Sequence, residues 1–522
     1  VAARLAVVLG FAVALLGALL LGWPDAGENR DGERVVVGRE VPVTPMNLSW
    51  GAANNSPVLM ADPTQHSFVV LANRLDAPAF NCALQVSGDG GRSWLPADPV
   101  PQLPPDAEKC YAPEVAFDRA GRLYYLFVGL AGRGNEPMGV FLTTSDDRGR
   151  TFSPPHQVLG GLNFAVRMAI DPSLGETGRL HLVWLQATSD PPTAAFGPPP
   201  NPILAAYSDD GGRTFSEPVQ VSSPQRARVV APALALGPGH AVHVAYYDLQ
   251  DDAVDYQGLE GPTWPGNWSV VLASSFDAGR SFDTEMVIDH QVKPHERVML
   301  IFTMTPPAVV ADPSGRVCAA WTDARFGDGD AVLRCSADRG ATWGSLQRLN
   351  DDLVGNGATQ YQPRLAFAPE GRLDAVFYDR REDPQNVANH VSFTYSSDGA
   401  KSFAPNLRLT SDPSSTLIGQ RYVNVSAEGM VEFGSRMGLL SQPDGAVAAW
   451  TDTRNTRLGT SQDIFVSSVL FPAPGPGSQR RLAGLALLAA GTAIAALAWG
   501  YRSREARPQE KTAGEPQTAR TG

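Results

Sequence analysis

One eight-residue pattern, S-x-D-x-G-x-[ST]-[WF], occurs six times in this chain at nearly equal spacing, the sixth copy having Ala400 in place of its Gly. The first serines of successive copies lie 58, 63, 67, 61 and 60 residues apart. The acidic residues of the six copies are Asp89, Asp147, Asp210, Asp277, Asp338 and Asp398. A fixed period of this length is typical of a fold in which repeated units stack and bury their apolar faces against one another.

Each copy of the pattern predicts a tight turn between two strands. The Asp carboxylate can accept hydrogen bonds from backbone N–H groups of its own turn, and the Gly can adopt backbone angles that other residues resist. Apolar runs such as 83–86 and 332–335 precede the turns, and an aromatic residue follows each one. Such runs, broken by Gly, Pro and Asp, predict an all-β chain.

The pattern resembles the Asp box, or BNR repeat, of sialidases and related β-propellers. The resemblance covers most of residues 33–472 and implies a β-propeller domain over this range, in which the six Asp residues of the boxes are structural. It also implies that a ligand or substrate would bind on the face opposite the Asp-box turns, where sialidases have their active site.

The number of blades follows from counting strands around the boxes. A seventh unit follows the sixth box, with three predicted strands at 436–440, 446–451 and 463–471 but no fourth. Residues 34–44, which precede the first unit, read as the missing strand and would close the ring, which removes exposed sheet edges. We therefore expect seven blades. Because sialidases usually have six, six blades with an irregular extra segment is the alternative.

Two apolar segments flank the repeats. Residues 5–23, preceded by Arg4, predict a signal peptide or an uncleaved anchor within 1–26. Residues 482–500 are long enough for a transmembrane helix and follow a Pro/Gly-rich linker at 473–481. Basic residues after this helix predict that the polar, disordered tail 501–522 is cytoplasmic. The propeller would then lie outside the cytoplasm, held at the cell membrane.

Cysteine usage and charge restrict the compartment and the partners. Four cysteines fit an oxidising compartment, and their places on the predicted strands favour two disulfides, Cys82–Cys110 and Cys318–Cys335, over four buried thiols. No Cys-x-x-Cys or His cluster suggests zinc. The formal net charge of −12 argues against nucleic acid as a partner and allows acidic ligands only where arginines gather.

One series of residues occupies equivalent positions near the start of the innermost strand of each unit. Its members are Val58, Glu114, Arg167, Ala233, Ala308, Arg364 and Arg436. Arginine binds carboxylates through planar, bidentate contacts. Because sialidases hold the carboxylate of sialic acid with three arginines, the resemblance makes Arg167, Arg364 and Arg436 candidate ligand residues, with Glu114 beside them. The alternative is that they pair with Glu114 and with Asp residues of neighbouring blades and are structural.

A second series of charged residues ends the second strands. Its members are Asp248 and the pairs Asp323 with Arg325, Asp379 with Arg381, and Asp452 with Arg454. These are further candidate ligand residues, although their regular repetition favours a girdle of ion pairs between blades. No cofactor is expected. The acidic loops 328–330 and 248–252 could hold calcium, but such loops are usually only solvated.

A sialidase would also need a Tyr nucleophile, a Glu partner and a separate Asp acid/base. No spacing selects a set from Tyr111, Tyr247, Tyr361, Tyr378 and Tyr422 with Asp76, Glu114, Glu296 and Glu432, so the catalytic residues stay unassigned. The F/Y-R-I-P motif of sialidases is absent, and the equivalent stretch at 56–59 reads S-P-V-L. We therefore predict an extracytoplasmic propeller that binds a glycan or another acidic ligand. An exo-sialidase-type hydrolase and an envelope assembly factor with a protein partner are the alternatives.

Overall fold

Strand-forming runs of about the predicted lengths fold into seven antiparallel sheets in the computed structural model of the chain. The structure describes residues 35–44, 52–75, 79–96, 102–133, 135–175, 177–187, 200–252, 264–294, 304–416, 433–454 and 462–471. The expected membrane and tail segments, 1–26 and 473–522, lie outside these ranges. Among the described residues, no helix has the length and apolar character needed to span a bilayer.

Each sheet is one blade, and the blades are numbered in chain order. Within each blade the strands are given from the one nearest the ring axis outwards. Blade 1 contains β3 (Asn54–Asp62), β4 (Gln65–Leu75), β5 (Asn81–Ser87) and β6 (Leu95–Pro96). Blade 2 contains β7 (Lys109–Phe117), β8 (Leu123–Ala131), β9 (Glu136–Ser145) and β10 (His156–Leu159). Blade 3 contains β11 (Asn163–Asp171), β12 (Arg179–Gln186), β13 (Ile203–Ser208) and β14 (Val219–Gln220).

The next three blades follow the same order of strands. Blade 4 contains β15 (Val229–Gly237), β16 (Ala241–Asp248), β17 (Trp268–Ser275) and β18 (Thr284–Val292). Blade 5 contains β19 (Ala308–Ala311), β20 (Val317–Asp323), β21 (Asp330–Ser336) and β22 (Gln347–Arg348). Blade 6 contains β23 (Gln360–Phe367), β24 (Leu373–Asp379), β25 (Ala388–Ser396) and β26 (Leu407–Arg408), and β27 (Ser414–Ser415) also pairs with β25.

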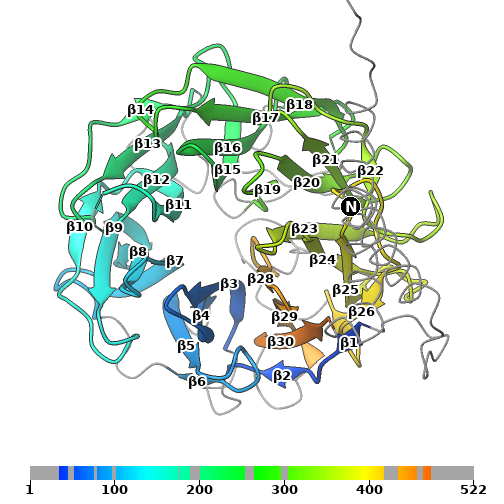
Figure 1. Ribbon diagram of the computed structural model, residues 1–522, viewed down its shortest axis with the longest axis horizontal. Coiled ribbons are helices and arrows are strands. Elements are labelled where there is room, and N and C mark those ends of the chain that lie inside the picture. The colour runs from blue at the N-terminus through cyan, green and yellow to red at the C-terminus, as the bar shows by residue number, and fades with distance from the viewer. Residues whose placement is uncertain are drawn as a thin grey trace, which may run out of the picture. The chain divides into compact units, whose positions relative to one another are not determined.

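Blade 7 is assembled from both ends of the repeat region. It contains β28 (Gly438–Gln442), β29 (Gly445–Asp452) and β30 (Asp463–Leu470), with β1 (Val36–Val37) and β2 (Val41–Pro42) on its outer side. Within the unit formed by residues 37–470, the innermost strands β3, β7, β11, β15, β19, β23 and β28 each contact the next, and β28 contacts β3. Figure 1 shows the resulting ring of sheets around one axis.

The strand predicted at 34–44 closes this ring. Val41 lies opposite Val466 in an antiparallel ladder, and Gly38 N donates to the Ser468 carbonyl oxygen at 2.7 Å. Blue β2 and orange β30 lie side by side in Figure 1. The prediction of seven blades is therefore confirmed and six blades is wrong. The segment forms two short strands rather than one continuous strand.

Large side chains of the second strands fill the space between blades. Trp184, Trp321 and Trp450 occupy equivalent positions in three blades and are less than 2% exposed. The second strands are buried along almost their whole length because a neighbouring blade covers each face. Both predicted disulfides form: Cys82–Cys110 joins blades 1 and 2, and Cys318–Cys335 joins two strands of blade 5.

The six repeated turns share one set of hydrogen bonds, which the second copy illustrates. Asp147 accepts bonds from Thr151 N at 2.8 Å and from Thr151 Oγ1 at 2.6 Å, while Ser145 Oγ accepts one from Gly149 N at 2.8 Å. The turn places both Arg148 and Gly149 at positive φ, so the conformation needs two left-handed residues where the sequence pattern indicated only one. The carboxylate therefore replaces lost backbone partners and holds a strained turn.

The hydrogen bonds of the turns predict a dependence of stability on pH. Bonds from Thr151 to the ionised carboxylate lower the pKa of Asp147 from 3.8 to about 2. A carboxylate with a depressed pKa stabilises the fold above pH 3.8, and this contribution is lost as the pH falls towards 2. In urea titrations between pH 5 and pH 2, Asp147→Asn should show a shallower decline in unfolding free energy than the wild type.

The close approach at Gly38 offers a test of ring closure. A Cβ atom at this position would meet the Ser468 side chain and lie 3.1 Å from its carbonyl oxygen, whereas one at Gly88 would have no atom within 4 Å. Gly38→Ala should therefore lower the unfolding free energy by about 1–3 kcal/mol through overpacking. Gly88→Ala should change it little. Equal effects of the two variants in thermal melts would contradict the closure described above.

Candidate functional site

A β-bulge precedes the candidate position in five of the innermost strands. The bulged residues have positive φ, and they are Ser56, Ala112, Ala165, Ala231 and Gln362. A bulge re-aims the side chain that follows it. The residue two places later is Val58, Glu114, Arg167, Ala233 or Arg364. Sequence reasoning did not find these bulges, although Pro follows four of the five bulged residues and could have drawn attention to them.

Glu114 lies between two of the three candidate arginines. Arg167 Nη1 donates to Glu114 Oε1 at 3.1 Å, and Arg436 Nη1 donates to the same oxygen. Glu114 belongs to blade 2, Arg167 to blade 3, and Arg436 lies just before β28 of blade 7. Arg436 Nη2 also donates to the Pro113 carbonyl at 2.7 Å. These contacts join three blades near the ring axis.

The third candidate, Arg364, has no hydrogen-bond or ion-pair partner among the described residues, and its Nε is buried. Burial and the positive charge of Arg436 lower the pKa of Arg364, while the charge of Glu114 opposes this shift. Burial likewise lowers the pKa of Arg167 to about 10, against the charge of Glu114 and with the charges of Arg436 and Arg364. The charges of these arginines therefore influence one another, and only Arg167 and Arg436 contact the one carboxylate between them.

The bulges also hydrogen-bond from blade to blade. Gln362 N donates to Thr322 Oγ1 of blade 5 at 3.1 Å, and Gln362 Nε2 donates to the Gly434 carbonyl at 2.6 Å. Ser435 N donates to Ser56 Oγ at 2.9 Å. Four blades are thus connected through the residues that immediately precede the candidate positions. The backbone that presents the charged side chains is held by bonds across the ring.

The second series of charges forms bridges farther from the ring axis. Arg325 of blade 5 contacts Asp323 at 2.6 Å and Asp289 of blade 4 at 2.9 Å. Arg334 of blade 5 bonds to the same Asp289. Trp321 Nε1 donates to Asp323 Oδ2 at 2.9 Å. Each of these arginines contacts at least one carboxylate, and the two share Asp289, as the interpretation of a girdle between blades expects.

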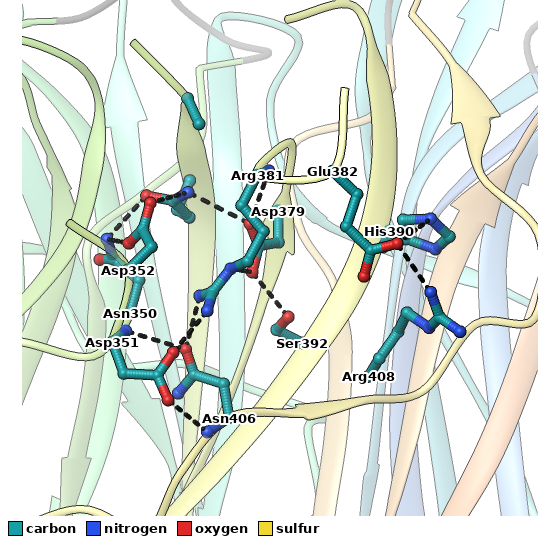
Figure 2. Close-up of polar contacts among 12 residues, drawn as sticks. Asn350, Asp351, Asp352, Asp379, Arg381, Glu382, His390, Ser392, Asn406 and Arg408 are labelled. Carbon is teal, nitrogen blue, oxygen red and sulfur yellow. Dashed lines mark hydrogen bonds and ion pairs between the residues drawn. The ribbon is translucent and has the colours of Figure 1, made fainter. Parts of the chain in front are cut away.

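The other members of the series repeat this arrangement. Arg381 of blade 6 pairs with Asp379 at 2.6 Å and with Asp351, which follows blade 5, as Figure 2 shows. Arg454 of blade 7 pairs with Asp452 at 2.7 Å and with Glu40, which lies between β1 and β2. Asp248 pairs with Arg226 at 2.7 Å. None of these arginines has a guanidinium free of carboxylate contacts, so the series does not offer an open anion site.

The tyrosines and acidic loops provide no assembled catalytic centre within the described residues. Tyr246 donates to Glu285, but this pair joins the second and outer strands of blade 4. Tyr111 OH accepts a bond from Arg74 at 2.7 Å. No three His, Cys, Asp or Glu side chains in the described part are placed to hold a metal. Four further candidates, Asp76, Glu296, Tyr422 and Glu432, lie outside the described residues.

Comparisons with known proteins found only solved structures of low sequence identity. No family model and no curated protein matches the chain. Among solved structures, a protein of unknown function from Dyadobacter fermentans is 14% identical, with 84% of this chain and 99% of that chain covered and a TM-score of 0.44. A Hadza microbial sialidase is 13% identical, with 78% and 74% covered and a TM-score of 0.42. The α-L-arabinanase of Penicillium chrysogenum is 15% identical, with 71% and 96% covered and a TM-score of 0.40.

A buried ion pair of the girdle should contribute more to stability than an exposed ion pair on the surface. The Asp289 side chain is 2% exposed and serves both Arg325 and Arg334. Asp289→Ala should lower the unfolding free energy by about 3 kcal/mol, because it leaves two partly buried cations without this partner. Arg408→Met breaks a pair with Glu382 in which both side chains are about half exposed, and should cost less than about 1 kcal/mol. Denaturant titration of both variants would reveal whether the girdle is structural.

Proposed function

We propose that this propeller binds an acidic ligand, most simply the carboxylate of an acidic glycan, at the central arginines. The observation that carries the proposal is Arg364, a partly exposed arginine whose buried Nε and whole guanidinium have no partner among the described residues, beside two arginines that already share one glutamate. The girdle of the same protein shows the usual alternative, in which each arginine has carboxylates of its own.

The charge balance at the centre supports an anion. Three arginines and one glutamate leave a local excess of two positive charges in a protein whose formal net charge is −12. Burying a charge without a partner is costly, and an arginine can satisfy that need with a bidentate carboxylate contact. A ligand anion beside Arg364 would supply the missing negative charge and be attracted by Arg167 and Arg436 as well.

The three arginines would not contribute equally. Arg436 already donates to Glu114 and to the Pro113 carbonyl, so it holds blades 7 and 2 together. Arg167 donates to Glu114 and to the carbonyl of its neighbour Val166. Arg364 is therefore the residue that we assign to direct ligand contact. Arg167, Arg436 and Glu114 would set the local field and the position of the site.

Binding is favoured over hydrolysis because no described Tyr–Glu pair stands beside Glu114. The Tyr246–Glu285 pair is already occupied by Arg226 and lies on the outer side of blade 4. Two disulfides support an oxidising compartment, and hence a site that meets ligands outside the cytoplasm. Anchoring through residues 482–500, with residues 1–26 as a signal or second anchor, remains part of the proposal.

The test compares Arg364→Met and Arg436→Met in the full-length chain. Binding would be measured on an array of sialylated, uronic acid-containing and neutral oligosaccharides, with Arg408→Met as the surface control. Arg364→Met should weaken the binding of acidic glycans by about 1.5–3 kcal/mol, which is the contribution of a charge-assisted hydrogen bond. It should leave the melting temperature unchanged or higher, because no described residue loses a hydrogen bond or ion pair and the unpaired buried Nε is removed. Arg436→Met should lower the melting temperature, because Glu114 would keep only Arg167 as an ion-pair partner and the Pro113 carbonyl would lose its donor.

The outcomes separate the possible functions. No binding of any acidic glycan by the wild type would refute the proposal. A fall in melting temperature with Arg364→Met as large as that with Arg436→Met would make Arg364 structural. Release of free sugar from the same oligosaccharides, abolished by Arg364→Met, would replace binding with a hydrolase at the same site.

A further inference from the structure

The two disulfides of this protein differ in the exposure of their cysteines. Cys82 and Cys110 are 5% and 3% exposed, and Cys318 is 0% exposed. Cys335 is the one cysteine of the four that is not buried. Among the described strands, β22 is the outer neighbour of β21, and its ladder reaches only to Leu333, two residues before Cys335. One disulfide therefore lies partly at the surface, and the other is enclosed.

The partly exposed disulfide joins two residues that the sheet already holds together. β20 and β21 form a hairpin with seven residue pairs in register, and Cys318 lies directly opposite Cys335 in this ladder. Cys82–Cys110 instead joins β5 of blade 1 to β7 of blade 2, two strands that belong to different sheets. Breaking Cys318–Cys335 therefore leaves the hairpin in place, whereas breaking Cys82–Cys110 removes a covalent link between blades.

Thiol–disulfide exchange requires that an attacking thiolate reach one sulfur of the disulfide. A dithiol would attack Cys335 Sγ, form a mixed disulfide with it and release Cys318 as a thiolate, which takes up a proton. The second thiolate of the dithiol would then attack its own sulfur in the mixed disulfide and release Cys335. The dithiol is oxidised by two electrons to a disulfide, and the two cysteines are reduced to thiols.

We propose that Cys318–Cys335 is a thiol–disulfide exchange site, which dithiols reduce while the propeller stays folded. Cys82–Cys110 has no exposed cysteine and is a structural bond. The exchange is reversible, because the ladder keeps the two thiols opposite each other and ready to be oxidised again. The site belongs to one hairpin of blade 5 and uses none of the central arginines, so the inference is independent of the proposed function.

The test compares the two disulfides within the same molecule. The full-length, folded chain would be incubated with dithiothreitol without denaturant, and samples taken at intervals would be alkylated and mapped by mass spectrometry. Cys318 and Cys335 should become alkylated about tenfold faster than Cys82 and Cys110, because exchange follows access to the sulfur. A sample in which only Cys318 and Cys335 are alkylated should still show a cooperative thermal melt, since the hairpin ladder remains.

Two single-cysteine variants test access without a reductant. Cys318→Ala leaves Cys335 as a free thiol, and Cys110→Ala leaves Cys82. In the folded proteins, Cys335 should react with an aromatic disulfide reagent about tenfold faster than Cys82 does.

The alkylation experiment uses the unaltered chain and does not depend on the folding of either variant. Equal alkylation rates for the two disulfides would overturn the inference. Alkylation of Cys318 and Cys335 only at denaturant concentrations that unfold the chain would overturn it as well, because both disulfides would then be structural.

Discussion

The ladder between β2 and β30 is the interaction on which the rest of the structure depends, because it makes blade 7 a complete sheet and turns a row of blades into a ring. The central charges come from blades on both sides of this closure. Glu114 accepts hydrogen bonds from Arg167 of blade 3 and from Arg436, which lies next to β28 of the closing blade. An open row of the same sheets would place Arg436 far from Glu114, so the candidate site exists only in the closed ring.

Arginine has two different environments in this ring. In the girdle, residues such as Arg325 lie against carboxylates of their own blade and the preceding one, so their charges are balanced. Near the axis, Arg167 and Arg436 share Glu114, and Arg364 has no described partner. The number of carboxylates for each guanidinium, rather than the presence of arginine, separates the structural positions from the candidate ligand site.

The sequence predicted the architecture well because the repeat period reports blades directly. The absence of a fourth strand in the last unit predicted the closing strand. Cysteines across one hairpin and cysteines near the junction of the first two units predicted the two disulfides. The arginines could be aligned by repeat position, but their partners could not. Pairing depends on side-chain direction, which the bulge before Arg364 changes, and on reach across blades, which brings Arg436 to Glu114. The hydrogen bond from Gln362 Nε2 to the Gly434 carbonyl likewise joins residues 72 positions apart in the chain.

Closure by the first and last strands also has a consequence for the order of events during synthesis. Val41 lies opposite Val466, so the ribosome must add 425 residues before the partner of β2 exists, the difference between the two positions. At about 5–20 residues per second, this interval lasts roughly 20–90 s. Throughout that time the other blades can fold as local hairpins, whereas the segment containing Val41 stays without its sheet. A nascent chain of this protein therefore carries an unpaired strand for longer than most small domains take to fold.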